Sequence, residues 1–170
     1  MSKTKEPAEI KSNETSRIEA FSDGVFAIAI TLLVLELIQI LHPQNSEGLF
    51  KYYLHHWEPF LAFLIGFFTI LICWINHHHV FAYIKKTDSR LPWVNGFVLL
   101  MITFTPFPTA ILAELLETEG KFAITIFGFN YFMIALASYW LCAYTYNRSL
   151  IDNDDREFFH HIKLTYGYSI

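Results

Sequence analysis

Long uncharged stretches dominate the pattern of polar and apolar positions along the chain. Three of them contain no Asp, Glu, Lys or Arg: 26 residues from Pro59 to Ile84, 23 from Leu91 to Ala113 and 26 from Phe122 to Asn147. The hydrocarbon core of a bilayer is about 30 Å thick, and a helix needs about 20 residues to cross it. Each stretch is therefore long enough to form a transmembrane helix.

A fourth apolar stretch, near the N-terminus, is interrupted by charge. Residues 24–35 are uncharged but lie between Asp23 and Glu36, and a helix over 18–41 would be long enough to span while carrying three carboxylates. A secretory signal peptide is not expected, because no small-residue cleavage site follows and the polar leader is long. The pattern predicts an all-α membrane protein with four transmembrane helices per chain, at about 18–41, 58–84, 92–114 and 122–147.

The basic residues indicate the orientation of these helices. Ten of the twelve Lys and Arg lie in or next to a polar leader (1–16), in the loop after the second span, or in the tail (148–170), and the opposite loops hold only Lys51 and Lys121. Basic segments stay in the cytoplasm, so both termini are expected there. The leader is expected to be mobile, the membrane domain to cover 17–147, and the end of the tail to resemble the start of a fifth span.

Composition and motifs exclude several classes of function. Only 16% of the residues are charged and the net charge is −4, whereas nucleic-acid binding needs a clustered basic surface. Cys73 and Cys142 both lie in apolar runs and form no metal-binding or disulfide pattern. The chain has no GxSxG, P-loop, GxGxxG or HExxH motif, and Ser22 lacks the paired base of a nucleophile. No catalytic residue, metal site or cofactor is expected.

The first predicted helix carries an apolar stripe with one hydroxyl group. On a helical wheel, six residues fall within about 80° of one another: Gly24, Ile28, Thr31, Leu32, Leu35 and Gln39. Asp23 lies about 140° from Ile28 on the same wheel. The stripe either packs against a neighbouring helix or, if several copies surround an axis, lines a pore. The spacing alone leaves both possibilities open.

The second span ends in a cluster of histidines. Trp74 lies one turn before His77 and His78, whereas His79 points elsewhere. A zinc site prefers two histidines at i and i+4 with a carboxylate nearby, and this spacing does not occur here. We therefore expect a structural polar contact, in which an imidazole forms a hydrogen bond with a buried partner such as Asp23.

The third span contains Asn95 near its inner end and two prolines further out. Pro106 and Pro108 each remove a backbone donor, which predicts a kink, and Thr103 and Thr105 are placed to bind the freed carbonyls. These residues predict a helix shape and specify no chemistry.

Together these motifs resemble the transmembrane protein 175 family, the endosomal and lysosomal potassium channels and their prokaryotic relatives. The first-helix pattern of that family is matched at Arg17, Phe21, Ser22, Asp23, Thr31, Leu32, Leu35 and Glu36. Later spans match it at Trp74, His77, His78, Asn95, Pro106, Phe107 and Thr109. The resemblance covers roughly residues 15–147.

The resemblance implies a homotetrameric, potassium-permeable cation channel in a prokaryotic cell membrane, with the first helices lining a central pore. Ile28, Leu32 and Leu35 would form a hydrophobic constriction or gate, and Thr31 a layer of hydroxyl groups. No backbone-carbonyl filter is implied, since no TVGYG-like loop occurs. The polar network that holds the pore helix would consist of Arg17, Phe21, Ser22, Asp23, Trp74, His77 and Asn95.

The chain departs from the family in the number of spans, because prokaryotic members usually have six and only four are found here. Two other functions therefore stay open: a non-conducting or truncated membrane subunit, and a secondary transporter. A transporter is disfavoured because the chain shows no repeated halves. The oligomeric state separates channel from transporter, since the pore needs several copies. Implied partners are other copies of the chain, membrane lipid and monovalent cations.

Overall fold

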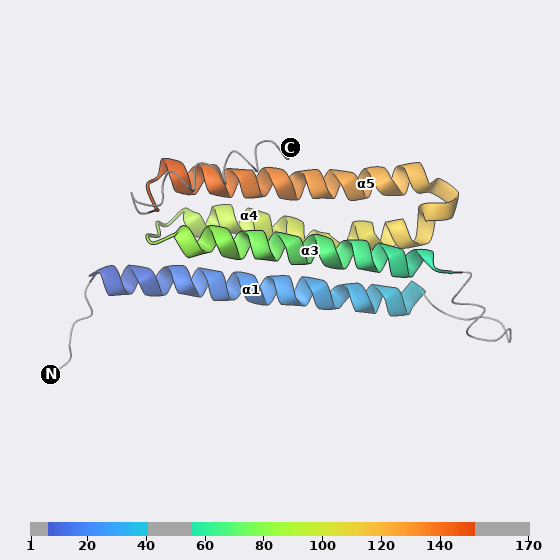
Figure 1. Cartoon of the computed structure of the whole chain (residues 1–170), viewed down its shortest axis with the longest axis horizontal. Coiled ribbons are helices and arrows are strands. Elements are labelled where there is room, and N and C mark those ends of the chain that lie inside the picture. Colours follow the sequence, from blue (N-terminus) through green and yellow to red (C-terminus); the bar gives the residue numbers. More distant parts are fainter. Residues whose placement is uncertain (1–6, 41–55, 152–170) are drawn as a thin grey trace.

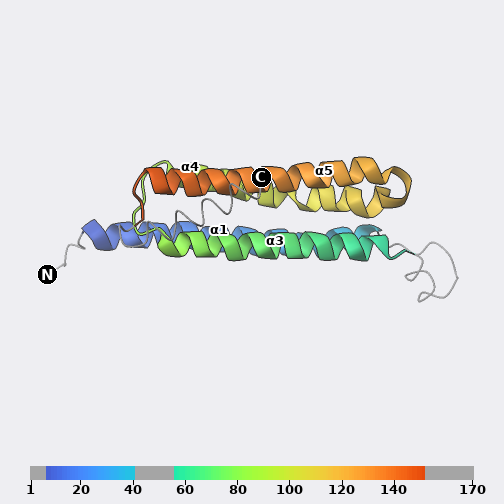
Figure 2. The same cartoon turned by 45° about the horizontal axis from the view of Figure 1, so that its top comes forward.

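The computed structural model describes residues 7–40 and 56–151, and in this part the chain forms four helices. They are α1 (Pro7–Ile40), α3 (Glu58–Tyr83), α4 (Leu91–Phe104) and α5 (Pro106–Asn147). Figure 1 shows them side by side, and Figure 2 shows two layers, with α1 and α3 in one and α4 and α5 in the other. The predicted all-α class is confirmed.

Of the helical runs in the described residues, three are long and apolar enough to cross a membrane, whereas the sequence predicts four such spans. The predicted number of spans is therefore corrected. In the described part, the runs long and apolar enough to cross a membrane are Glu14–Ile38, Glu58–Tyr83 and Leu91–Asn147. The third has 57 residues and would be about 86 Å long if it were straight. It reverses instead at Glu119, where φ is −131° and ψ is 43°. The second arm of α5 then returns beside α4 (Figure 1). The expected spans 92–114 and 122–147 are joined because helical backbone continues on both sides of this kink without a separate loop.

The expected third span is also broken within the membrane segment. Pro106 has no N–H group to continue the ladder, so α4 ends at Phe104 and α5 begins one residue after Thr105. The Thr105 N–H donates to the Ile102 carbonyl at 3.1 Å, which tightens the last turn of α4. The two prolines thus interrupt the ladder of hydrogen bonds at the position where the sequence predicts a kink.

Parts of both predicted terminal segments belong to the helical bundle. The sequence predicts a mobile leader over 1–16, whereas α1 begins at Pro7, and proline is favoured in a first helical turn. At the other end, Leu150 and Ile151 are buried, and the N–H groups of Lys85 and Lys86 donate to the Leu150 carbonyl at 3.0 and 3.1 Å. The first residues of the expected tail therefore belong to the core. The proposed start of a fifth span lies outside the described residues.

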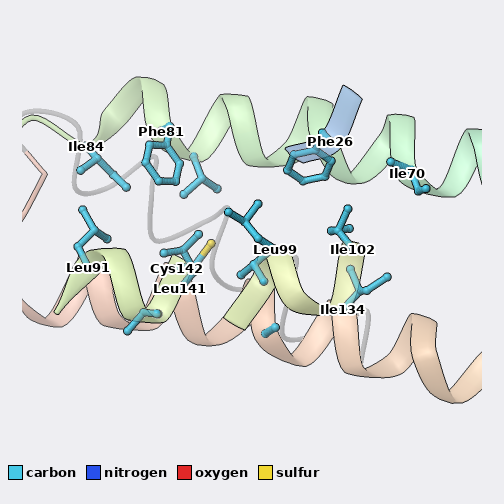
Figure 3. Close-up of a cluster of buried hydrophobic side chains, with 14 of the residues drawn as sticks. Phe26, Ile70, Phe81, Ile84, Leu91, Leu99, Ile102, Ile134, Leu141 and Cys142 are labelled. Atoms are coloured by element: carbon cyan, nitrogen blue, oxygen red, sulfur yellow. The ribbon is translucent and has the colours of Figure 1, made fainter. Parts of the chain in front are cut away.

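The core lies between the two layers of helices. Figure 3 shows side chains from all four helices converging there, including Phe26, Ile70, Phe81, Leu99, Ile102, Ile134 and Leu141. Towards the other end of the bundle, α3 approaches α5 closely at Gly66, where an added Cβ would lie 2.9 Å from the Thr109 Oγ1 atom. Lipid is as apolar as these side chains, so close packing of this kind rather than water exclusion stabilises helix contacts in a membrane.

Candidate functional site

One face of α1 is left uncovered by the other residues that the structure describes. The Ile28 side chain is 60% exposed and Leu35 is 54% exposed, and Leu32 and Thr31 are also exposed. At Gly24 an added Cβ would meet nothing within 4 Å. From Gly24 to Leu35, the stripe predicted from the sequence therefore packs against no other helix in the described part of the chain.

The opposite face of α1 is fully buried. Ser22, Phe26, Ala29 and Leu33 are at most 1% exposed, and their spacing of three and four residues places them on one side of the helix. Ile30, which lies about 200° from Ile28 on the wheel, packs against this core. Side chains on α1 thus divide sharply between an inner and an uncovered face.

Thr31 is oriented by its own helix. Its hydroxyl donates to the Ile28 carbonyl at 2.8 Å, so the hydrogen is turned towards the backbone. The free lone pairs of the oxygen remain on the exposed face. Thr31 can therefore offer an acceptor, and not a donor, to whatever occupies the space beside the stripe.

A tryptophan holds the intramembrane carboxylate of α1. The Trp74 indole N–H donates to an Asp23 carboxylate oxygen at 2.8 Å, which joins α3 to α1. The sequence suggested a histidine as the partner of Asp23, and this pairing is corrected, since His77 binds another side chain. The indole N–H is always a donor. The indole is therefore the donor of this contact and the carboxylate its acceptor.

A second contact is a chain of hydrogen bonds with a single direction. The Ser22 hydroxyl donates to the Ile18 carbonyl at 2.8 Å, and it accepts from the Asn95 amide nitrogen, also at 2.8 Å. The Asn95 amide oxygen is thereby turned towards His77 Nε2, 2.7 Å away. Because that oxygen can only accept, Nε2 must carry the hydrogen. This series of hydrogen bonds therefore fixes the imidazole tautomer and connects α3, α4 and α1.

His77 is enclosed by aromatic rings on the sides that the hydrogen bond leaves open. Phe81 stacks on it at 4.4 Å and Phe26 lies at 5.3 Å between ring centroids. Its Nδ1 atom is buried and has no hydrogen-bond partner among the described residues. A second proton on this ring would find no acceptor, so His77 serves here as a neutral donor.

The sequence interpretation missed one contact of this region. His78 Nδ1 lies 3.2 Å from a Glu19 carboxylate oxygen, and the His78 ring stacks on Trp74 at 5.8 Å. Glu19 lies four residues before Asp23 and therefore on the same face of α1, which is the signal that could have identified it. Two carboxylates of α1 are thus both held by the last turns of α3.

Two residues expected in the network lie outside it. Arg17 forms no ion pair with Asp23 in the described part of the chain, and Phe21 is 67% exposed. Both line a groove of about 720 Å³ that opens between α1 and α4. The reason is geometric: α1 presents Ser22 inward, so Phe21 and Arg17, one and five residues earlier, point away from the core. The structure brings together Ser22, Asp23, Trp74, His77 and Asn95.

A separate polar contact lies in the loop between α3 and α4. One Asp88 carboxylate oxygen accepts from the N–H groups of Leu91 and Arg90, and the other accepts from the Tyr144 hydroxyl. Partial burial raises the pKa of Asp88, but these three hydrogen bonds outweigh it and hold that pKa below the ordinary value for aspartate. The contact joins the loop to the end of α5 without involving α1.

Possible metal ligands are scattered rather than clustered. Over residues 7–40 and 56–151, no three His, Cys, Asp or Glu side chains come close enough together to hold an ion. The polar side chains that do meet are engaged with other protein groups, and Asn95 for example binds both Ser22 and His77. Their arrangement can orient a helix, and it contains no nucleophile paired with a base.

Comparison with known proteins identifies relatives over most of this chain. Residues 17–106 match the family described as endosomal/lysosomal potassium channel TMEM175. A potassium channel of Chamaesiphon minutus is 43% identical over 150 residues, which cover 86% of this chain and 74% of the relative. The TMEM175 protein of Gallus gallus, named an endosomal/lysosomal proton channel, is 33% identical over 59% of this chain and 22% of its own length.

A solved structure shows the same fold. It is described as a lysosomal potassium-selective channel TMEM175 homolog from Chamaesiphon minutus, and it is similar to this chain with a TM-score of 0.81 at 39% identity. The match covers 92% of this chain and 80% of the solved one. The family resemblance predicted from the sequence is thereby confirmed.

Proposed function

Since the chain belongs to the TMEM175 family of membrane channels, we propose that it is a potassium-permeable cation channel built from four copies around a central pore. The observation that carries this proposal is the uncovered apolar face of α1. Ile28 and Leu35 are more than half exposed although the other side of the same helix is completely buried. One stripe encloses nothing, whereas four such stripes around an axis enclose a channel.

The proposed constriction is a ring of Ile28 side chains, extended outward by Leu32 and Leu35. Aliphatic side chains give a cation no oxygen to replace its hydration shell, and a narrow apolar ring can also lose its water. Thr31 lies one turn away, and four of its oxygens would face a partly hydrated cation as acceptors. Selectivity would then depend on these oxygens and on pore width, without a filter of backbone carbonyls.

The proposed membrane arrangement places both termini in the cytoplasm. The reversal at Glu119 supports it, because the second arm of α5 returns to the end of the bundle at which α4 begins (Figure 1). The loop at residues 85–90 contributes three basic side chains to the same end as the first turns of α1. Basic residues favour the cytoplasmic side, so this end of the bundle would face the cytoplasm of the cell.

Potassium flux through purified protein in liposomes tests the proposal, with Ile28→Asn and Ile30→Asn as a matched pair. Ile28→Asn should raise basal flux and weaken the preference for potassium over sodium, because amide oxygens hydrate the ring. Ile30→Asn places the same group in the packed face and should reduce assembly without opening the pore. The mass of the detergent-solubilised complex should correspond to four chains. A monomer, or equal leak from both variants, would contradict a pore lined by this stripe.

A further inference from the structure

Two polar side chains are buried where α4 ends and α5 begins. Thr105 lies at this break and is 0% exposed, and Asn130, on the second arm of α5, is 4% exposed. The Asn130 amide nitrogen donates to the Thr105 hydroxyl oxygen at 3.1 Å. Burying a polar side chain at membrane depth is costly unless it has a partner, so residues of this kind commonly serve a function. Neither residue belongs to the uncovered stripe or to the contacts that hold Asp23 and Asn95.

Thr105 binds the backbone carbonyls that the break would leave unpaired. In a continuous helix its N–H group would donate to Met101, four residues earlier. Pro106 has no N–H group for the Ile102 carbonyl, and the Thr105 N–H donates to that carbonyl instead. The Thr105 hydroxyl then donates to the Met101 carbonyl at 3.2 Å, and its oxygen remains able to accept from Asn130. Asn130 thus fixes the side chain that holds the break in shape.

The break is connected to α1 through the first turn of α5. Thr109 donates its N–H and its hydroxyl to the Thr105 carbonyl, at 3.2 and 2.9 Å. Its side chain lies against Gly66 of α3, where an added Cβ would be 2.9 Å from Thr109 Oγ1 and 3.3 Å from Leu33 Cδ2. Thr109 and Leu33 also border one small cavity of about 10 Å³. A shift at the break would therefore reach the buried face of α1.

Leu33 is next in sequence to a residue of the uncovered stripe. Leu33 is 1% exposed, whereas Leu32 is 39% exposed. Both belong to the same helical turn of α1, so a displacement of Leu33 moves Leu32 with it. A close-packed interior transmits displacements of this kind, because it has few voids into which a side chain can move. The position of the break and the position of the stripe are therefore coupled through packed side chains.

We propose that the hydrogen bond from Asn130 to Thr105 positions the constriction on α1. It holds the break between α4 and α5, and the packing of Thr109 and Gly66 against Leu33 passes the position of the break to α1. Asn130 is thus a positioning residue that touches no permeating ion. The effect on conduction rests on the proposed function, whereas the link between the break and α1 can be measured without it.

Hydrogen–deuterium exchange of the purified full chain in mild detergent, measured by mass spectrometry, tests the link. Asn130→Leu removes the bond and should speed amide exchange about fivefold, the effect of one hydrogen bond on an opening equilibrium. The faster exchange should be confined to two segments, 101–109 at the break and 28–36 of α1. Thr105→Val removes the same bond from its other partner with almost no change in shape, and it keeps the test valid where Asn130→Leu does not fold.

Two variants serve as controls for this measurement. Thr105→Ser keeps the hydroxyl group and should exchange at the wild-type rate. Asn76→Leu removes an asparagine of α3 that takes no part in this contact, and it should leave both segments unchanged. Faster exchange at the break with unchanged exchange in α1 would overturn the proposal. Equally faster exchange in every segment would also overturn it, because that result indicates a general loss of stability.

Potassium and sodium flux in liposomes, normalised to the recovered four-chain complex, tests the effect on the constriction. Asn130→Leu and Thr105→Val should each lower the preference for potassium by up to about fivefold, whereas Thr105→Ser should keep it. The double variant should lose no more than either single one, because both remove the same bond. An unchanged preference in both single variants would overturn the proposal. A wild type without flux would contradict the proposed channel, and exchange in α1 would still decide whether the break and α1 are linked.

Discussion

The two faces of α1 have similar hydropathy but opposite surroundings. The inner face combines Phe26, which is 1% exposed, with the small residue Ala29 and the hydroxyl of Ser22. The uncovered face consists of large aliphatic side chains around Thr31, with Ile28 at 60% exposure. The inner face fits its neighbours by shape and hydrogen bonds, whereas the uncovered face is more uniform and forms no hydrogen bond to another helix within the described residues.

This difference shows how a membrane helix is oriented when lipid and core are equally apolar. Water exclusion cannot select a face under these conditions, so packing and hydrogen bonds must do so. Asp23 with Trp74, and Ser22 with Asn95, attach one side of α1 to α3 and α4. The opposite side is thereby presented outward as a defined surface, which is the one that the proposed tetramer would use.

The largest expected loss of stability follows from removal of the Phe26 ring from the inner face. Phe26→Ala should lower the free energy of unfolding by about 3–5 kcal/mol, because it opens a cavity among buried side chains of all four helices. Ile28→Ala removes a similar apolar group from the uncovered face and should change it by less than about 0.5 kcal/mol. Unfolding in mixed micelles of sodium dodecyl sulfate, followed by tryptophan fluorescence, measures both. Equal losses would mean that the two faces are not distinct.

The next effect concerns the hydrogen-bond chain behind the inner face. Asn95→Leu leaves the buried Nε2–H of His77 without an acceptor, which should cost about 1–3 kcal/mol. Asn95→Asp keeps an acceptor for His77 but no longer donates to Ser22. It should therefore lower the free energy of unfolding by less than Asn95→Leu does. A ¹⁵N NMR spectrum of His77 should show hydrogen on Nε2 in the wild type. Hydrogen on Nδ1 instead would contradict the donor and acceptor roles assigned to His77 and Asn95.

Sequence reasoning recovered α1 well because its signals are local. The stripe from Gly24 to Leu35 follows from helical spacing alone, and the structure leaves that same stripe uncovered. The partners of its polar residues could not be derived in this way. Asp23 meets Trp74 and not His77 because the rotation of α3 about its own axis depends on packing against three other helices. Spacing within one helix carries no information about that rotation.

The helix count failed for a different physical reason. Charge-free stretches predicted separate spans on either side of residues 115–121, and a loop between them. This segment contains Glu117 and Glu119 but no proline, and its residues have good helix propensity apart from Thr118 and Gly120. The backbone therefore stays helical up to a single kinked residue, Glu119. The reversal was predictable from charge, whereas the persistence of the helix depended on local propensity.

A smaller loss of stability is expected at Gly66 of α3, which packs against Leu33 on the inner face of α1 and against Thr109 of α5. An alanine at Gly66 would place its Cβ 2.9 Å from Thr109 Oγ1 and 3.3 Å from Leu33 Cδ2. Both contacts are with side chains rather than backbone, so Gly66→Ala should cost about 1 kcal/mol, at the low end of overpacking effects. Thr109→Ala in the same background should recover part of the loss, in the same micelle unfolding assay. No recovery would place the strain elsewhere.

The smallest effect is expected from a polar contact that does not touch α1. Asp88 binds Tyr144 and two backbone N–H groups, and its pKa is lower in the folded protein than in the unfolded chain. A group of this kind stabilises the fold above its unfolded pKa, near 4, and this contribution disappears as the pH falls through the lower folded value. Wild type should therefore lose stability between about pH 4 and more acid conditions, and Asp88→Asn should lose less over the same interval. Thermal unfolding by circular dichroism in detergent at a series of pH values measures this slope, while potassium flux at neutral pH should be equal in the two proteins. Altered flux in Asp88→Asn would mean that the loop between α3 and α4 influences the uncovered face of α1, although no hydrogen bond of Asp88 reaches that helix.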